Sequence, residues 1–142
     1  MVYIYYNSEI QGIMGEGNKK RKAKDSIKIR LLINNWVENR EYLKHDISIE
    51  KLGKLIGINR TYVSNYINDT YNLNFNTWVH SMRIAEAKKI ILSSSDMSMG
   101  QVAIITGYAD QAHLSKQFKM ITGMSPVKWK KEQTEGRKEI TA

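Results

Sequence analysis

Two short segments, 60–68 and 111–119, each place several polar and basic side chains within nine residues. Both are rich in hydroxyl, amide and basic groups, which make hydrogen bonds but form no nucleophile–base pair. Such groups can read base edges, with amides suited to adenine and basic groups to guanine. At helical spacing, the outward residues are Arg60, Thr61, Ser64, Asn65 and Asn68, then Gln111, Ala112, His113, Ser115, Lys116 and Lys119.

Each segment occupies the same place in an internal repeat, which runs over 48–79 and again over 98–130. The first halves match at an offset of 50 and the second halves at an offset of 51, because the second copy gains one residue. Both copies predict a helix-turn-helix unit, and two such units on one chain suggest a reader of two neighbouring DNA sites. The matched pairs are Ser48/Ser98, Leu52/Val102, Leu55/Ile105, Gly57/Gly107, Val63/Leu114, Ser64/Ser115, Ile67/Phe118, Asn72/Gly123 and Trp78/Trp129.

Capping residues define the helices of the first copy. Ser48 is a predicted N-cap, and Gly57 ends that helix because glycine takes a left-handed backbone without strain. Asn59 caps the following helix, which should run to about Thr70. Asn72 suits a left-handed end, since Asn is the next best residue in that region.

The second copy carries the same signals. Ser98 and Gln101 are spaced for a capping box, Gly107 makes the turn and Asp110 opens the next helix. Gly123 ends it, and Pro126 fits the first turn of a short last helix. We expect the apolar residues to face inward, namely Ile49, Leu52, Leu55, Ile56, Tyr62, Val63, Tyr66, Ile67, Leu114, Phe118, Ile121 and the three tryptophans.

No strand pattern of useful length occurs, so the predicted fold is all-α, with two helix-turn-helix subdomains joined by a long linker helix. Asp25-Ser26 should cap a first helix that ends near Arg40, and Asn76 or Thr77 should open the linker helix. The expected organisation is a basic flexible arm over 1–24, a first subdomain over 25–76, a linker helix over 77–93, a second subdomain over 94–131 and a charged tail over 132–142.

Composition narrows the class of partner. The net charge is +8, and residues 48–131 carry eleven Lys/Arg against five Asp/Glu, which favours a polyanionic partner. There are no cysteines, and the three histidines lack ligand spacing, so we expect neither metal nor cofactor. No apolar run reaches the roughly 20 residues of a membrane span, and the start does not read as a signal peptide. We therefore expect a cytoplasmic protein.

The motifs in their order resemble the DNA-binding domain of the AraC/XylS transcription regulators. Residues 83–92 are similar to the family's linker-helix signature, 107–119 to its second unit and 122–126 to its closing motif. The resemblance covers about residues 40–131, and Asn72 and Ala109 depart from it. It implies a bacterial transcription factor that binds double-stranded DNA and works with RNA polymerase. The family's N-terminal sensor or effector domain is absent, which favours a piece of a longer chain.

The resemblance also implies residue roles. The two repeats add the hypothesis that a rigid linker helix holds the recognition helices about 34 Å apart, one DNA turn, in successive major-groove segments. If the separation differs from the DNA repeat, the DNA must bend or only one unit inserts. The expected base contacts are Thr61, Ser64, Asn65, Gln111, His113, Ser115 and Lys116. The expected phosphate contacts are Arg60, Asn68, Arg83 and Lys119, although Arg83 could instead pair with Asp110 or Glu86.

Two rival functions make different demands on the sequence. A helical adaptor that contacts RNA polymerase or a sensor domain, with weak DNA affinity, would show an exposed apolar patch. An enzyme would need a phosphate loop, a metal cluster or a nucleophile–base pair, and the sequence offers none of these. The basic run over 19–24 could touch phosphates or could be a solvated tail. Activation versus repression, the operator and the inducing signal are not encoded in any motif.

Overall fold

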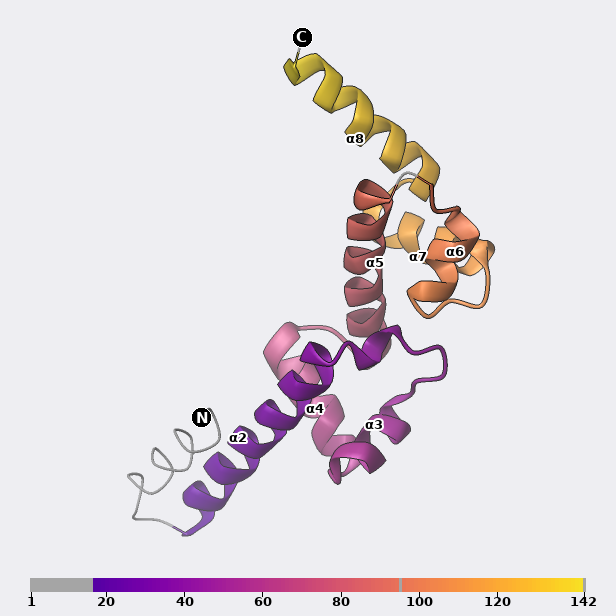
Figure 1. Cartoon of the computed structure of the whole chain (residues 1–142). Helices are drawn as coiled ribbons and strands as arrows, with labels where there is room; N and C mark the ends of the chain where they lie inside the picture. The colour runs from indigo at the N-terminus through magenta and orange to yellow at the C-terminus, as the bar shows by residue number, and fades with distance from the viewer. Residues whose placement is uncertain (1–16, 95, 142) are drawn as a thin grey trace. The chain divides into compact units, whose positions relative to one another are not determined.

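The computed structural model describes residues 17–94 and 96–141, and every element in these ranges is a helix (Figure 1). The all-α prediction is therefore confirmed. The elements in chain order are α2 (Gly17–Glu38), the short 3-10 helix η1 (Glu41–Leu43), α3 (Ile49–Ile56), α4 (Arg60–Tyr71), α5 (Phe75–Ser93), α6 (Met99–Ile105), α7 (Gln111–Thr122) and α8 (Pro126–Thr141).

These helices form two compact units. Of the described residues, unit 1 contains 17–41 and 48–75, and unit 2 contains 42–47 and 76–141. Each unit holds one helix-turn-helix pair, α3–α4 in unit 1 and α6–α7 in unit 2. The short segment 42–47 belongs to unit 2, although it lies in sequence between two parts of unit 1. The subdomain boundaries and the linking role of α5 stay predictions.

Unit 1 packs α2 and α3 against α4. Its tryptophan is inside, as the helical spacing predicts: Trp36 is buried, and its ring centroid lies 6.5 Å from that of Phe75. Helix α5 begins at Phe75, just before the expected start. The buried apolar residues of unit 1 are Ile29, Ile33, Trp36, Leu52, Val63, Ile67 and Phe75.

Unit 2 packs α6, α7 and the start of α8 with α5. Trp129 lies at the edge of this core, with its ring edge-on to Phe118 at 5.7 Å and the Lys88 ammonium 5.7 Å from its centroid. Such contacts add specific geometry to apolar burial. The core cluster is Ile84, Ala87, Ile91, Val102, Ala103, Tyr108, Leu114 and Phe118.

Two helices are longer than the sequence suggested. Helix α2 begins at Gly17, so Asp25 and Ser26 lie inside it and do not cap it. Lysine, arginine and alanine are good helix formers, which explains why the basic run extends the helix. Helix α8 continues to Thr141, so the charged tail is helical as far as it is described. The rest of the expected basic arm, 1–16, lies outside the described residues.

Three apolar side chains expected inside are exposed: Leu55 at 67%, Tyr62 at 66% and Ile121 at 42%. On α4 the two buried residues, Val63 and Ile67, are four apart, and Tyr62 stands one position before this row. A side chain one position from such a row is turned by about 100° around the helix and points away from the core.

Candidate nucleic-acid interface

The turn between α3 and α4 is built as the first copy predicts. The Ser48 hydroxyl accepts a hydrogen bond from the Lys51 amide, and the Asn59 side chain accepts one from the Thr61 amide. Gly57 has a φ of 70°, and Asn72 ends α4 with a φ of 55°. The predicted caps and left-handed ends of this copy are confirmed, and they fix where α4 starts.

The turn between α6 and α7 is built in the same way. Ser98 and Gln101 form the predicted capping box, and the Asp110 carboxylate accepts a hydrogen bond from the His113 amide. Gly107 has a φ of 91°, and Gly123 ends α7 with a φ of 84°. These predictions are also confirmed.

Each of the two turns contains the same kind of internal backbone hydrogen bond. The Ile58 amide donates to the Gly53 carbonyl, and the Tyr108 amide donates to the Ala103 carbonyl, both at 2.9 Å. Ile58 and Tyr108 are equivalent at the repeat offset of 50. The two copies therefore enter their second helices through the same local geometry.

The second helices have the same burial order, residue by residue. Over 60–68 and over 111–119, three exposed residues come first, then a buried one, a half-buried one, an exposed one, a half-buried one, a buried one and an exposed one. The buried positions are Val63 and Ile67 in α4, and Leu114 and Phe118 in α7. The two helices thus present the same positions to solvent with different chemistry.

Most of the predicted contact residues lie on these outward faces. Ser64 and Ser115 are half-buried at the equivalent position. The other candidates are exposed, namely Arg60, Thr61, Asn65 and Asn68 on α4, and Gln111, His113, Lys116 and Lys119 on α7. On α4 the amides dominate and on α7 the two lysines, so the two faces differ most in charge.

Arg83 does not lie where a phosphate contact would require. Its side chain is buried, with 6% of its surface exposed. Its Nε donates to the Tyr42 carbonyl and its Nη2 to the Lys44 carbonyl, each at 2.7 Å. We therefore remove Arg83 from the phosphate-contact set, because burial and these two bonds direct the guanidinium into unit 2.

Tyr62 is a surface residue that the apolar pattern alone places in the core. It is equivalent to His113 at the repeat offset of 51, and both side chains are exposed. The same comparison makes Arg60 equivalent to Gln111. The internal repeat is the signal in the sequence that could have identified Tyr62 as an outward residue.

Arg60 has an acidic partner in this structure. Its Nη1 lies 3.0 Å from a carboxylate oxygen of Glu50, and both side chains are largely exposed. The equivalent residues of the second copy, Gly100 and Gln111, cannot form such a pair. An exposed ion pair of this kind contributes little stability, so it can open at small cost.

Comparison with known proteins identifies the fold that carries these faces. A family model described as a helix-turn-helix domain matches residues 52–132, more than half of the chain. The chain belongs to the AraC-type helix-turn-helix family. Proteins of this AraC-type family are DNA-binding transcription regulators and are not enzymes.

Individual relatives differ in how much of their length they share with this AraC-type chain. The HTH-type transcriptional regulator YisR of Bacillus subtilis is 30% identical over 91 residues, which are 64% of this chain and 31% of YisR. The probable transcription factor PqrA of Proteus vulgaris is 24% identical over 102 residues, which are 72% of this chain and 83% of PqrA. The chain therefore spans about a third of YisR and most of PqrA.

A solved structure shares the fold. The DNA-binding domain of the global transcriptional factor AdpA, determined in complex with a target DNA, has a TM-score of 0.67 and 18% identity, over 78% of this chain and 96% of the AdpA domain. At this identity the likeness concerns the fold, in which two helix-turn-helix units follow one another along an all-helical chain.

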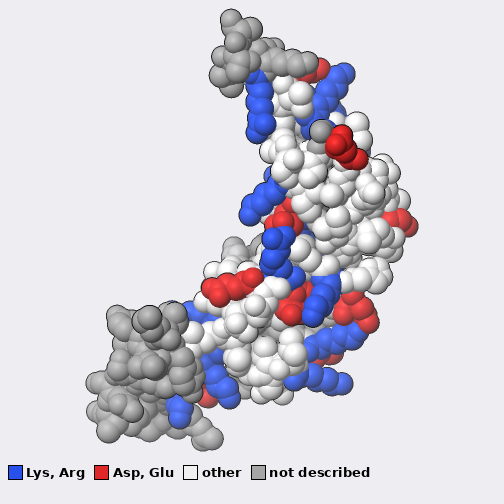
Figure 2. All heavy atoms as spheres, viewed as in Figure 1, with Lys and Arg blue, Asp and Glu red and all other residues white. Residues whose placement is uncertain are grey.

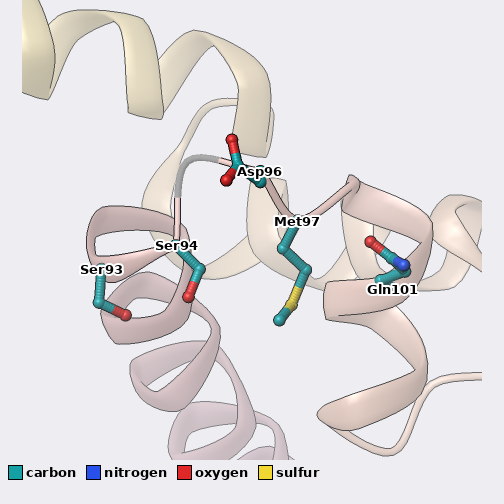
Figure 3. Close-up of a pocket in the computed structure, with 5 residues that line it drawn as sticks. All are labelled: Ser93, Ser94, Asp96, Met97 and Gln101. Atoms are coloured by element: carbon teal, nitrogen blue, oxygen red, sulfur yellow. The ribbon is translucent and has the colours of Figure 1, made fainter.

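Other features of this AraC-type chain do not compete with the helix faces as sites. An open hollow of about 480 Å³ where α5 ends and α6 begins is lined by Ser93, Ser94, Asp96, Met97 and Gln101 (Figure 3). Its lining holds one carboxylate and no base, and the Gln101 amide already caps Ser98. Within the described residues, no cluster of His, Cys, Asp or Glu could hold a metal, and no helix is long and apolar enough to cross a membrane.

Basic and acidic side chains are interspersed on one face of the described residues. On the face drawn in Figure 2, Asp and Glu side chains lie among the Lys and Arg side chains. On that face, the chain therefore presents no single continuous positively charged block to a polyanionic partner. The groups at the helix starts therefore become more important for binding an anionic partner, since a helix N-terminus presents free amides and a partial positive charge.

Proposed function

We propose that this chain is the sequence-specific, double-stranded-DNA-binding domain of an AraC-type transcription regulator, with α4 and α7 as its recognition helices in successive major-groove segments. The observation that carries the proposal is the shared burial order of these helices. A repeated scaffold that exposes the same positions with different polar groups is suited to reading two different base sequences.

Each outward face has a chemical preference. On α7, Gln111 is suited to adenine, the Lys116 ammonium to guanine, and His113 and Ser115 can add further hydrogen bonds. On α4, Asn65 is suited to adenine, while Thr61 offers a methyl and Ser64 a hydroxyl. We therefore propose two unlike motifs in the operator rather than two copies of one.

Two changes follow from the repeat. Tyr62 joins the candidates for base contact, because it stands where α7 has His113 and its ring can meet a thymine methyl group. Arg60 stands where α7 has Gln111, so we propose that it can reach a guanine edge as well as a phosphate. Asn68, Lys119 and the two helix starts are assigned to phosphates, which fix register without carrying sequence.

A helical adaptor is the second candidate, and one observation favours it. Leu55 and Ile105 are equivalent in the repeat, and both are exposed, at 67% and 46%. Exposed apolar side chains at a repeated position suit contact with another protein. RNA polymerase and a sensor or effector domain of the parent protein are the partners that we propose for such contacts.

Selection from a random-sequence duplex library at near-physiological salt tests the proposed function. We expect enrichment of two short motifs whose centres lie about one helical turn apart. Retention that is sensitive to salt but enriches no motif would contradict it, because that behaviour reflects phosphate contacts alone. The adaptor would then be the better account.

A further inference from the structure

The buried side chain of Arg83, on α5, binds segment 42–47 through hydrogen bonds. Its two hydrogen bonds go to backbone carbonyls of Tyr42 and Lys44, some forty residues earlier. Its guanidinium carbon also lies 5.3 Å from the centre of the Tyr108 ring, in a cation–π contact. Burial lowers the pKa of Arg83 while the Tyr108 side chain raises it, and the group stays charged at neutral pH.

Gly107 completes this arrangement from the turn of the second helix-turn-helix. A Cβ built on Gly107 would lie 2.8 Å from the Arg83 guanidinium and 2.8 Å from the Leu43 carbonyl oxygen. Only glycine leaves room there, and its φ of 91° also favours glycine. His45 Nδ1 lies 3.3 Å from the Gly107 carbonyl and donates to it when the proton is on Nδ1.

Segment 42–47 leads directly into Ser48, the first residue of the α3–α4 pair. The other end of that pair continues from Phe75 into α5, and α5 from Asn76 onward belongs to unit 2. Both chain connections of the first helix-turn-helix therefore start from unit 2. One connection is a continuous helix, and the other is held by Arg83, Gly107 and His45.

We propose that Arg83 is a positioning residue for two-site DNA recognition, because it holds 42–47 to unit 2 and so restrains the first helix-turn-helix at both of its ends. The inference rests on the proposed function, in which both pairs engage one DNA molecule. When two binding units are linked, the second contact gains from a high effective concentration only if the link limits their freedom. Without this restraint, segment 42–47 still joins the two units along the chain, but it limits the freedom of the first helix-turn-helix less.

The test compares Arg83→Lys with the unchanged chain on four duplexes: both selected motifs at their native spacing, both with the spacing altered, and each of the two motifs alone. Lysine keeps the charge but lacks the fork that reaches two carbonyls. We expect about a tenfold loss of affinity for the two-motif duplex and less than about a twofold change on single motifs. The variant should also discriminate less between spacings.

Single-motif binding shows that the variant is folded, and a loss there equal to the two-motif loss would overturn the positioning role. Equal ratios of two-motif to single-motif affinity in the variant and the unchanged chain would overturn it as well. Tyr108→Phe is the matched control, because it removes the hydroxyl bonded to His80 and keeps the ring beside Arg83. We expect it to preserve the spacing preference.

A measurement without DNA separates this inference from the proposed function. Backbone order parameters by NMR should be about 0.85 for 42–47 in the unchanged chain and below about 0.6 in Arg83→Lys. Unchanged order in the variant would overturn the inference even if two motifs are selected. Lost order would support the restraint of 42–47 by Arg83 even if the chain reads a single motif.

Discussion

Helices α4 and α7 are one scaffold used twice with different side chains. Their caps, their left-handed ends and the burial of nine successive positions agree. Their outward groups do not agree: α4 presents an arginine, a tyrosine and amides, whereas α7 presents a glutamine, a histidine and two lysines. The buried residues therefore fix which positions face outward, and in the proposed function the exposed residues set what each helix recognises.

The largest effect is expected from breaking the shared buried row. Phe118→Ala should destabilise the chain by about 3–5 kcal/mol, and the equivalent Ile67→Ala by about 2–5 kcal/mol, because each leaves a cavity in its unit. Chemical denaturation measures both. Met120→Ala, at an exposed position of α7, is the control and should change stability by about 0.5 kcal/mol or less. Similar losses of stability in Phe118→Ala and Met120→Ala would contradict the assignment of Phe118 to the buried row of α7 and Met120 to its exposed face.

The next largest effect separates the two outward faces. Lys116→Ala should cost about 1–3 kcal/mol at one base of one motif, and Asn65→Ala a similar amount at a base of the other, because each removes a base-edge contact. Binding to duplexes with single-base changes measures this. Lys128→Ala removes the same charge from α8 and should weaken all sequences alike. Relaxation of the same motif by both variants would contradict the assignment.

Tyr62→Ala should weaken binding by about 1 kcal/mol and only at the first motif, since an apolar contact to a thymine methyl is weaker than a bidentate pair. Competition binding with thymine replaced by uracil at each position measures it. Uracil lacks the methyl group, so the unchanged chain should lose affinity at one position and Tyr62→Ala should not. An equal loss in both proteins would show that the ring reads nothing there.

Removing the acidic partner of Arg60 should have a smaller effect in the opposite direction. Glu50→Gln frees Arg60 for DNA and should raise affinity by roughly 0.2–1 kcal/mol at low salt, the range of exposed ion pairs. Glu135→Gln removes an equal charge from α8 and serves as the control. If both variants raise affinity equally, the gain comes from net charge and the Arg60 pair has no special role.

We expect the smallest effect from a pH-sensitive contact in unit 2, because the His80 ring is only half-buried. Burial, and then the nearby Arg83, lower the pKa of His80 below its usual 6.5, and its Nδ1 lies 2.9 Å from the Tyr108 hydroxyl. Burial raises the pKa of that hydroxyl to about 12, so it stays protonated and can donate to the neutral ring.

The unfolded chain therefore binds more protons than the folded chain just below pH 6.5. The contribution of His80 to stability is complete above that pH and is lost as the pH falls through the folded pKa. Thermal unfolding between pH 7.5 and 5 should show this loss, and His80→Gln should reduce it. The first copy has Ile58 where the second has Tyr108, so it has no equivalent hydroxyl to form such a contact. An unchanged pH profile in His80→Gln would contradict the prediction.

Local signals explain why so much of the fold could be predicted. Ser48, Asn59, Asp110 and the Ser98–Gln101 box cap helices through contacts within three residues, so the sequence alone specifies them. The start of α2 is not predicted correctly, because the glycines and the charge run suggest an arm, while the intrinsic preference of Lys, Arg and Ala favours a helix.

Tertiary contacts explain what could not be predicted. The partners of Arg83 are carbonyls of 42–47, and no pattern of side chains announces a backbone partner about forty residues away. The exposure of Tyr62 contradicts its apolar character and is visible only by alignment with His113. The proposed site thus depends on which residues of the two repeats are equivalent, and local periodicity does not show that equivalence.

The most direct test of this account moves the outward chemistry of α7 onto α4. The variant combines Arg60→Gln, Thr61→Ala, Tyr62→His, Asn65→Lys and Asn68→Lys, and it leaves every buried residue unchanged. Selection from a random duplex library should then enrich the α7 motif twice, at the spacing of the original pair. Enrichment of the original two motifs, or of an unrelated sequence at the first position, would show that these outward residues do not carry the specificity.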